Sequence, residues 1–451
     1  MRPPPLSSMD VTDAGHLNND TTTKKNTWYD AAWFRWLQLV LIVGLLSSTV
    51  YLLVDRKNSA NSGSSSGTTS GTPDPTAAFE LENHYCPIPD NGWTAPSYAK
   101  MDQFTEACVV INNEADKIKL QGALTIPAGP GPFPVVVLVG GSGPTNMDAS
   151  DASSVNKMYK DVAYGLSSQG VAVLRYNKRA AQPSADPLNN VQCGLDALTN
   201  FKDYVNAFFG MNTVQNEYIK DALCALGQVG SFSSKLDMNK LTLAGHSEGA
   251  QIAPQLARDA EAKGIQISAV VLLASIVENF SQISVWQWYY LTRFDESKLN
   301  STNAQYRMLQ SPYIDTSWIG IGTGAYQVPS SYYQSLDPYS DPPNTVEQLT
   351  QPVLVMQGKA DYNVPYDLPT LPYGIYVSSF MSPEVGWNAK FSTSPRVTLK
   401  TYDNLCHYFW YVDVSKNPLD VPLSWPSLQT PENHVQEDVL TDMATWIKIN
   451  A

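Results

Sequence analysis

The sequence predicts an α/β domain with a doubly wound, mostly parallel sheet, preceded by a single transmembrane helix. From about Phe79 onward, short apolar runs rich in β-branched residues alternate with stretches of helical length and composition. Continuous apolar runs are typical of strands that are covered on both faces, and alternation of strand with helix favours a parallel sheet. Near the N-terminus, the 19 residues from Trp36 to Val54 carry no formal charge, which is the length of a membrane span.

Composition excludes several classes of protein. The chain has 451 residues, of which 43% are hydrophobic and 16% charged, so it supports a large core and is not disordered throughout. The 42 acidic residues outnumber the 29 basic ones, which argues against a nucleic-acid partner. Five Cys and five His are scattered along the chain without ligand spacing, and we therefore expect no metal and no organic cofactor.

The N-terminal part is interpreted as a polar tail, an anchor and a stalk. Residues 1–35 are polar, and the apolar run 36–54 rises about 28 Å as a helix, close to the thickness of a hydrocarbon core. It is too long and begins too late for a cleaved signal peptide, although a buried helix of the globular domain is the alternative. Residues 55–78 are rich in Ser, Gly and Thr and predict a flexible stalk. The domain then covers residues 79–451.

The flanking charges favour a cytoplasmic N-terminus and a lumenal or extracellular domain. Three basic residues precede the span and two follow it: Lys24, Lys25, Arg35, Arg56 and Lys57. Two glycosylation acceptors, Asn279 and Asn300, agree with that orientation. Disulfides between Cys86 and Cys108 and between Cys193 and Cys224 would leave Cys406 unpaired, whereas reduced cysteines in a cytosolic domain are the alternative.

The predicted strands and helices place the functional motifs at one edge of the sheet. We expect strands at 135–139, 171–174, 241–244, 270–273, 353–356 and 397–402, and helices at 157–168, 251–263 and 435–448. In such a sheet ligands bind outside the carboxyl ends of the strands. Each motif described below follows a predicted strand.

The strongest motif is Gly245-His-Ser-Glu-Gly249, which lies between a predicted strand and a predicted helix. This pattern is typical of a nucleophile elbow, in which a serine occupies a strained turn. It predicts Ser247 as the nucleophile and the backbone N–H of Glu248 as a donor to an oxyanion. A second match, Gly63–Gly67, lies in the predicted stalk and has no strand before it.

A serine nucleophile needs a base and a carboxylate that orients the base, and both should follow later strands. His407 and His434 are the histidines that follow Ser247. His407 comes directly after a strand and is predicted to be the base, whereas His434 is expected at the surface or at a helix start. Asp361, just beyond the 353–356 strand, is the predicted carboxylate; Asp367 and Asp403 are alternatives expected to be solvated loop acids.

The loop Gly140-Gly-Ser-Gly-Pro144 follows an early strand and predicts the second oxyanion donor. The N–H of Ser142 is the first choice and that of Gly141 the rival. A phosphate-binding loop is the alternative, but the lysine of a P-loop and the third glycine of a dinucleotide loop are absent.

These motifs together resemble the α/β-hydrolase fold serine esterases, in particular the dienelactone-hydrolase-like and serine-aminopeptidase-like group. The resemblance covers roughly residues 100–450 and includes Leu120–Pro127, Gly170–Arg179 and Gln357–Val364 besides the elbow. It implies the catalytic set Ser247, Asp361 and His407. The chain departs from the usual pattern at Gly140, at Thr145–Asp148 and at Asn177.

The predicted function is ester hydrolysis by a membrane-anchored serine hydrolase through an acyl-enzyme, on a small-molecule ester or acyl substrate. The aromatic-rich segment within 278–350 predicts a lid over an apolar pocket, with core helices as the alternative. A peptidase or thioesterase could use the same residues, and Glu248 is the candidate for pairing with a substrate amine. A non-catalytic binding module with the same fold is the alternative from another class.

Overall fold

The computed structural model describes the greater part of the domain that follows the predicted stalk. The described residues are 92–143, 146–149, 155–179, 213–278, 335–368, 378–416 and 430–451, with positions 283, 286, 319–320, 327–328 and 428. The chain divides into two compact units, Met1–Ser64 and Ser65–Ala451, and all described residues lie in the second. The predicted tail, anchor and stalk, and both glycosylation acceptors, lie outside the described residues.

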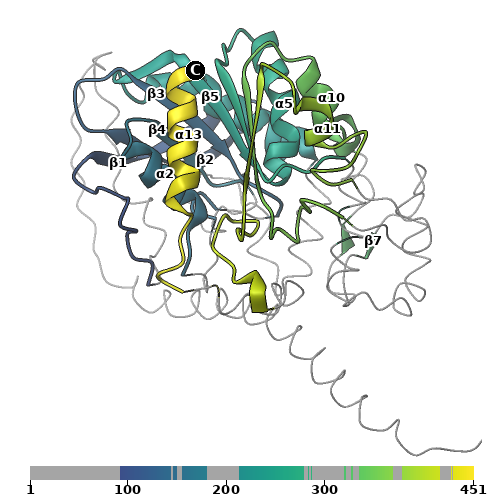
Figure 1. Ribbon diagram of the computed structural model, residues 1–451. Helices are drawn as coiled ribbons and strands as arrows, with labels where there is room; N and C mark the ends of the chain where they lie inside the picture. Colours follow the sequence, from purple (N-terminus) through teal and green to yellow (C-terminus); the bar gives the residue numbers. More distant parts are fainter. Residues whose placement is uncertain are drawn as a thin grey trace, which may run out of the picture. The chain divides into compact units, whose positions relative to one another are not determined.

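An eight-stranded mixed sheet forms the centre of the described part (Figure 1). Its order is β1-β2-β4-β3-β5-β6-β9-β10. The strands are β1 (Phe104–Asn113), β2 (Ile118–Pro127), β3 (Phe133–Val139), β4 (Ala172–Tyr176), β5 (Leu236–His246), β6 (Ala269–Leu273), β9 (Val353–Gly358) and β10 (Val397–Tyr402). Strand β2 pairs antiparallel with both β1 and β4, and all later pairs are parallel. The order reverses around β3, so the carboxyl ends of β3 and β5 lie at the topological switch point.

Helices cover both faces of this sheet, as Figure 1 shows. Helices α2 (Met158–Ser167) and α13 (Glu437–Asn450) pack on one face, and α4 (Asp221–Gln228) and α5 (Glu248–Ala262) on the other, together with the short helices α10 (Pro342–Glu347) and α11 (Trp387–Phe391). Alternate residues of β3 face opposite layers: Val135, Val137 and Val139 join the α5 side, whereas Val136 and Leu138 join the α2 side. This double burial explains the continuous apolar runs of the sequence.

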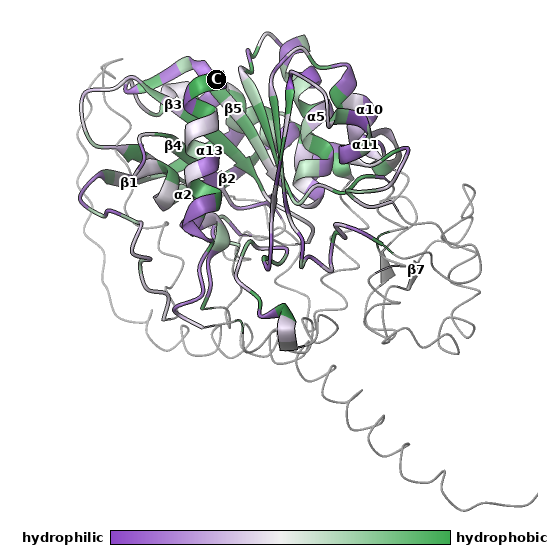
Figure 2. Ribbon diagram, viewed as in Figure 1, coloured by the Kyte–Doolittle hydropathy of each residue, from purple (hydrophilic) through white to green (hydrophobic). Residues whose placement is uncertain are grey.

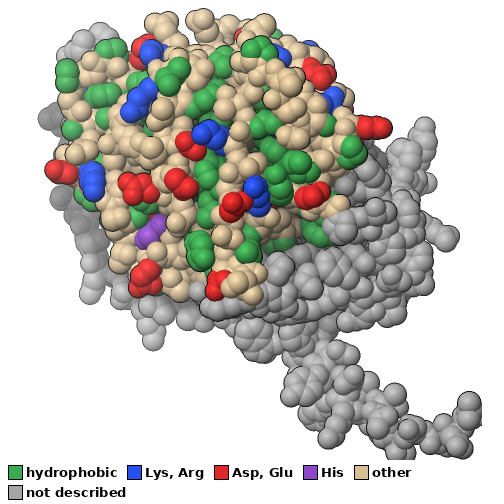
Figure 3. Space-filling view, in the orientation of Figure 1, with side chains coloured by type: hydrophobic (Ala, Val, Ile, Leu, Met, Phe, Trp, Pro, Cys, Tyr) green, Lys and Arg blue, Asp and Glu red, His purple; other side chains and the backbone are tan. Residues whose placement is uncertain are grey.

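Hydropathy follows the same layers. In Figure 2 the central strands are largely hydrophobic, and the helices carry hydrophilic residues on the sides turned away from the sheet. On the face drawn in Figure 3, acidic and basic side chains are interspersed among the described residues. A small antiparallel pair, β7 (Ile319–Gly320) and β8 (Gln327–Val328), falls within the predicted lid region, most of which lies outside the described residues.

The six predicted strands and three predicted helices are all present, with ends shifted by a few residues. The hairpin β1–β2 was not among the predicted strands. Its outer strand mixes buried, half-buried and exposed residues, since it lies at the edge of the sheet, and this pattern is less distinctive than a continuous apolar run.

The cysteines correct one prediction. Cys108 is disulfide-bonded, to a cysteine outside the described residues. Cys224 and Cys406 are free, so the predicted bridge between Cys193 and Cys224 is wrong, whereas Cys406 is unpaired as expected. None of the helices in the described ranges combines the length and the hydrophobicity that crossing a bilayer requires.

Candidate active site

Ser247 occupies a strained turn between β5 and α5. Its backbone has φ 56° and ψ −120°, a conformation that a residue with a side chain adopts only under constraint. Its N–H donates to the carbonyl of Leu273 at 2.9 Å, and its own carbonyl accepts from the N–H groups of Ala250 and Gln251 at 3.0 Å. The turn is therefore held from β6 and from the first turn of α5, and Glu248 is the first residue of that helix.

The two glycines of the elbow are required by close backbone contacts. A Cβ atom on Gly245 would lie 2.3 Å from the carbonyl oxygen of Gly249, and one on Gly249 would lie 2.4 Å from that of Gly140. Any side chain there would force the strand, the helix and the oxyanion loop apart. The spacing seen in the sequence thus has a steric cause.

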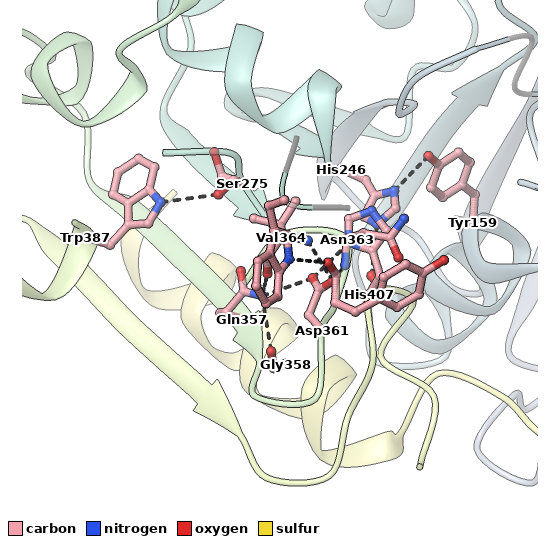
Figure 4. A network of polar contacts seen from close by, with 12 residues as sticks. Tyr159, His246, Ser275, Gln357, Gly358, Asp361, Asn363, Val364, Trp387 and His407 are labelled. Carbon is pink, nitrogen blue, oxygen red and sulfur yellow. Dashed lines mark hydrogen bonds and ion pairs between the residues drawn. The ribbon is translucent and has the colours of Figure 1, made fainter. Parts of the chain in front are cut away.

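Asp361 and His407 meet at the ends of β9 and β10 (Figure 4). The Nδ1 atom of His407 lies 2.8 Å from Oδ2 of Asp361, and both residues are buried. Since a carboxylate only accepts hydrogen bonds, the hydrogen is assigned to Nδ1, and Nε2 of the neutral ring is left as an acceptor. That tautomer suits a general base.

The carboxylate of Asp361 is held by three further donors. Its Oδ1 accepts from the backbone N–H groups of Asn363 at 2.8 Å and Val364 at 2.9 Å. Its Oδ2 accepts from the side-chain amide of Gln357 at 3.0 Å as well as from His407. Four hydrogen bonds therefore fix the plane of the carboxylate that faces the imidazole.

His246 connects the elbow to the loop that carries His407. Its Nε2 lies 3.0 Å from the backbone carbonyl of His407, and its Nδ1 lies 3.1 Å from the hydroxyl of Tyr159. A carbonyl only accepts, so Nε2 carries the hydrogen and the Tyr159 hydroxyl donates to Nδ1. Burial lowers the pKa of His246 well below its usual value, and the neighbouring His407 adds to this; the ring is neutral. The hydrogen bond from His246, the residue before Ser247, therefore links the elbow to the loop that contains His407.

The oxyanion loop is fixed on both sides of Gly141. The N–H of Gly141 donates to the Tyr159 hydroxyl at 2.7 Å, so this rival donor is already engaged. Ser142 is exposed beside it. A Cβ atom on Gly141 would lie 3.2 Å from the Cβ of Ser247, which places the loop directly against the elbow.

His434 lies just before α13, one of the two places predicted for it, and not at the surface. It is buried, and its Nδ1 lies 3.1 Å from Oδ1 of Asp161 in α2. The same carboxylate accepts from the indole of Trp93 at 3.0 Å and from the N–H of Val435 at 3.1 Å. This second Asp–His pair joins the start of α13 to α2. Asp367 and Asp403 are exposed, as expected of loop acids.

Glu248 and one tryptophan of the predicted lid segment are engaged inside the domain. Glu248 is buried. The pKa of Tyr218 is raised well above its usual value by burial and, in addition, by the nearby carboxylate of Glu248. Trp286, from the predicted lid, is buried and donates to the carbonyl of Tyr362 at 2.8 Å. Trp286 thus packs on the turn that carries Asp361.

Four residues that support the site were not predicted from the sequence: Tyr159, Lys178, Tyr218 and Gln357. Two of them lie in sequence stretches that resemble the esterase family. Gln357 is four residues before Asp361, and Lys178 lies within Arg175–Arg179. Tyr159 and Tyr218 lie in helical segments with no distinguishing local pattern. Among the described residues, no three His, Cys, Asp or Glu side chains are arranged to hold a metal ion.

Known proteins similar to this chain include esterases. No family model matches the chain. The chain is 29% identical over 353 residues to esterase EstD of Thermotoga maritima, covering 78% of this chain and 69% of the relative. Among solved structures, a Pyrobaculum calidifontis esterase aligns with 77% of this chain and 87% of its own at 15% identity and a TM-score of 0.41. Pyrococcus horikoshii acylaminoacyl peptidase aligns over 77% of this chain and 42% of its own, at 12% identity and a TM-score of 0.45.

The order of the sheet, the strained serine between β5 and α5, and the relative in Thermotoga agree with one another. The chain is similar in sequence to an esterase, and its mixed sheet and strained serine turn are those expected of the α/β-hydrolase fold.

Proposed function

We propose that the chain hydrolyses carboxylic esters through an acyl-enzyme formed on Ser247. The observation that carries the proposal is the 2.8 Å hydrogen bond between His407 and Asp361, in a loop that touches the residue before Ser247. The similarity to an esterase supports an ester as the substrate.

In the proposed reaction the hydroxyl of Ser247 attacks the ester carbonyl while Nε2 of His407 takes its proton. Asp361 holds the imidazole in the required tautomer and stabilises the imidazolium that forms. The N–H groups of Glu248 and Ser142 stabilise the oxyanion. His407 then protonates the leaving alkoxide, and water, deprotonated by the same ring, releases the acid.

An ester substrate is favoured over a peptide with a free terminus. A peptidase of that kind needs a carboxylate exposed to the substrate amine, and Glu248 was the candidate. Glu248 is buried beside Tyr218, so it does not supply such a site.

The test is labelling of the full chain with a fluorophosphonate, followed by a panel of aryl esters, thioesters and aminoacyl amides. We expect Ser247 to be labelled and the Ser247→Ala variant to lose both labelling and ester hydrolysis. A labelled wild type that cleaves the amides alone would contradict the ester proposal. Labelling that persists in Ser247→Ala would show that another residue is the nucleophile.

We further propose that residues 36–54 anchor the protein in a membrane with the hydrolase domain on the lumenal or extracellular side. The uncharged run of 19 residues supports the anchor, and the disulfide of Cys108 supports an oxidising compartment. Extraction of membranes with alkaline carbonate should leave the full chain in the pellet. Release into the supernatant would contradict the anchor, and a domain digested by protease added to the cytoplasmic side would contradict the orientation.

A further inference from the structure

We infer that Lys178 is a positioning residue for the oxyanion hole: its buried ammonium group holds the carbonyl of Gly141 and thereby fixes the direction of the Ser142 N–H. The inference rests on the proposed function and names a device that serves it. Lys178 follows β4 by two residues, and its side chain is 2% exposed.

The ammonium group has three polar partners. Nζ lies 2.7 Å from Oε1 of Glu217, 3.0 Å from the carbonyl oxygen of Gly141 and 2.8 Å from the hydroxyl of Tyr218. Lys178 therefore donates hydrogen bonds to Gly141 and Tyr218 and forms an ion pair with Glu217. Glu217 and Tyr218 come from a π-helical turn, Gln215–Lys220, that leads into α4; such turns are frequent at functional sites.

The carbonyl of Gly141 receives a second donor. The hydroxyl of Tyr218 lies 2.8 Å from the same oxygen, with the carboxylate of Glu248 as a competing acceptor for its hydrogen. Lys178 is thus the charged donor to this carbonyl, and Tyr218 supplements it.

Peptide geometry transmits this anchoring to Ser142. The carbonyl of Gly141 and the N–H of Ser142 belong to one planar trans peptide, so they point in opposite directions. When Lys178 and Tyr218 hold the oxygen from inside the domain, the N–H is directed away from them. A hydrogen bond to an ion also polarises the peptide group and strengthens the N–H as a donor. The amide on the other side of Gly141 is fixed separately by Tyr159.

A purely structural role would be neutralisation of Glu217 in the interior. The two roles differ in what the double variant Lys178→Met with Glu217→Gln should do. Removing both charges leaves no unpaired buried ion, so a structural role predicts normal turnover. A positioning role predicts that turnover stays low in a folded protein.

The experiment measures kcat and KM with an aryl ester, together with the inhibition constant of an aryl trifluoromethyl ketone, whose adduct with Ser247 places an oxyanion in the hole. In the double variant we expect kcat to fall and the inhibition constant to rise by a similar factor, about 10- to 100-fold, less than the loss of a whole oxyanion donor. KM should be nearly unchanged, because the carbonyl oxygen carries little charge in the ground state.

The matched control is Arg179→Met with Asp221→Asn, which removes the neighbouring buried ion pair of 2.6 Å without touching the Gly141 loop. We expect kcat and the inhibition constant of this control to stay near wild type. If the Lys178 double variant does not fold, Tyr218→Phe tests the same carbonyl, with a smaller parallel loss expected.

Unchanged kcat and unchanged inhibition in a folded Lys178 double variant would overturn the inference, as would unchanged values in Tyr218→Phe should the double variant not fold. Failure of the proposed function is a separate result, because it appears in the wild type as absent ester hydrolysis or absent labelling of Ser247.

Discussion

At the scale of single residues, Gln357 orients one of the proposed catalytic groups. Gln357 is buried, and it donates to Asp361 at 3.0 Å and to the carbonyl of Val364 at 2.9 Å. It therefore fixes both the carboxylate and the turn that follows β9. A carboxylate free to rotate would hold the imidazole of His407 less firmly.

Replacement of Gln357 by Leu should lower kcat about tenfold while KM changes little, a loss typical of outer partners. The reason is that Oδ2 of Asp361 keeps His407 but loses its second donor. Steady-state kinetics of purified protein provide the measurement. Gln351→Leu is the control, because this buried amide at the other end of β9 bonds Glu261 instead; an equal loss in both variants would contradict the role of Gln357.

The hydroxyl of Tyr159 joins the oxyanion loop to His246. Tyr159→Phe leaves the N–H of Gly141 and Nδ1 of His246 without this partner, and such losses cost about 1–3 kcal/mol of unfolding free energy. We expect that loss in urea denaturation, together with lower kcat. Tyr98→Phe is the matched control, since the buried hydroxyl of Tyr98 has no hydrogen-bond partner among the described residues, and its removal should leave stability unchanged or higher.

Stability should depend on pH through His246. Burial lowers its pKa in the folded state, whereas the unfolded chain titrates near 6.5. Between those values the unfolded state binds the proton and the folded state does not, so the unfolding free energy rises with pH there and is lost as pH falls below about 6.5. The slope from this group is at most about 1.4 kcal/mol per pH unit.

Urea denaturation at pH 5.5, 6.5 and 7.5 (values set by the pKa near 6.5) would measure that slope in wild type and in His246→Gln. We expect a shallower pH dependence in the variant, because Gln does not titrate. Equal slopes in the two proteins would show that His246 contributes nothing in this range.

At the scale of elements, the domain uses two buried Asp–His pairs for different purposes. One joins the loops after β9 and β10 beside the elbow. The other, Asp161 with His434, joins α2 to the start of α13 and has Trp93 and Val435 as its neighbours. Chemically alike, the pairs differ in which elements they connect.

Substitution separates these roles. Asp161→Asn should cost about 3 kcal/mol of unfolding free energy, because the buried donors lose one acceptor oxygen and its negative charge, while kcat of the folded protein stays near wild type. Asp361→Asn should lower kcat about 10⁴-fold through the wrong imidazole tautomer. Thermal melts and steady-state kinetics on both variants provide the measurement. A large loss of kcat in Asp161→Asn would contradict a purely structural role for the Asp161–His434 pair.

At the scale of the whole molecule, the proposed machinery lies within the second compact unit. Every residue given a role in catalysis is found between Gly141 and His407. We therefore expect residues 1–78 to determine where the protein is located and to take no part in ester hydrolysis.

Deletion of residues 1–78 should give a protein that stays in solution and hydrolyses an aryl ester with kcat near that of the full chain in detergent. Secretion into an oxidising compartment keeps the disulfide of Cys108 in this comparison. A truncated protein that still sediments with membranes would place the anchor elsewhere, and one that folds but is inactive would show that the N-terminal part contributes to the site.

The strands that are buried on both faces could be predicted from the sequence, because a strand covered by helices on both sides needs apolar residues at consecutive positions. The sequence also determined the position of Ser247, because a strained turn between strand and helix demands glycines at 245 and 249, and it predicted the pair Asp361 and His407 from their places after two strands. The tertiary structure decided what those residues contact. Only folding brings Lys178 beneath Gly141, Tyr159 between Gly141 and His246, and His434 against Asp161. These contacts join segments far apart in the chain, and their geometry leaves no local pattern from which they could be predicted.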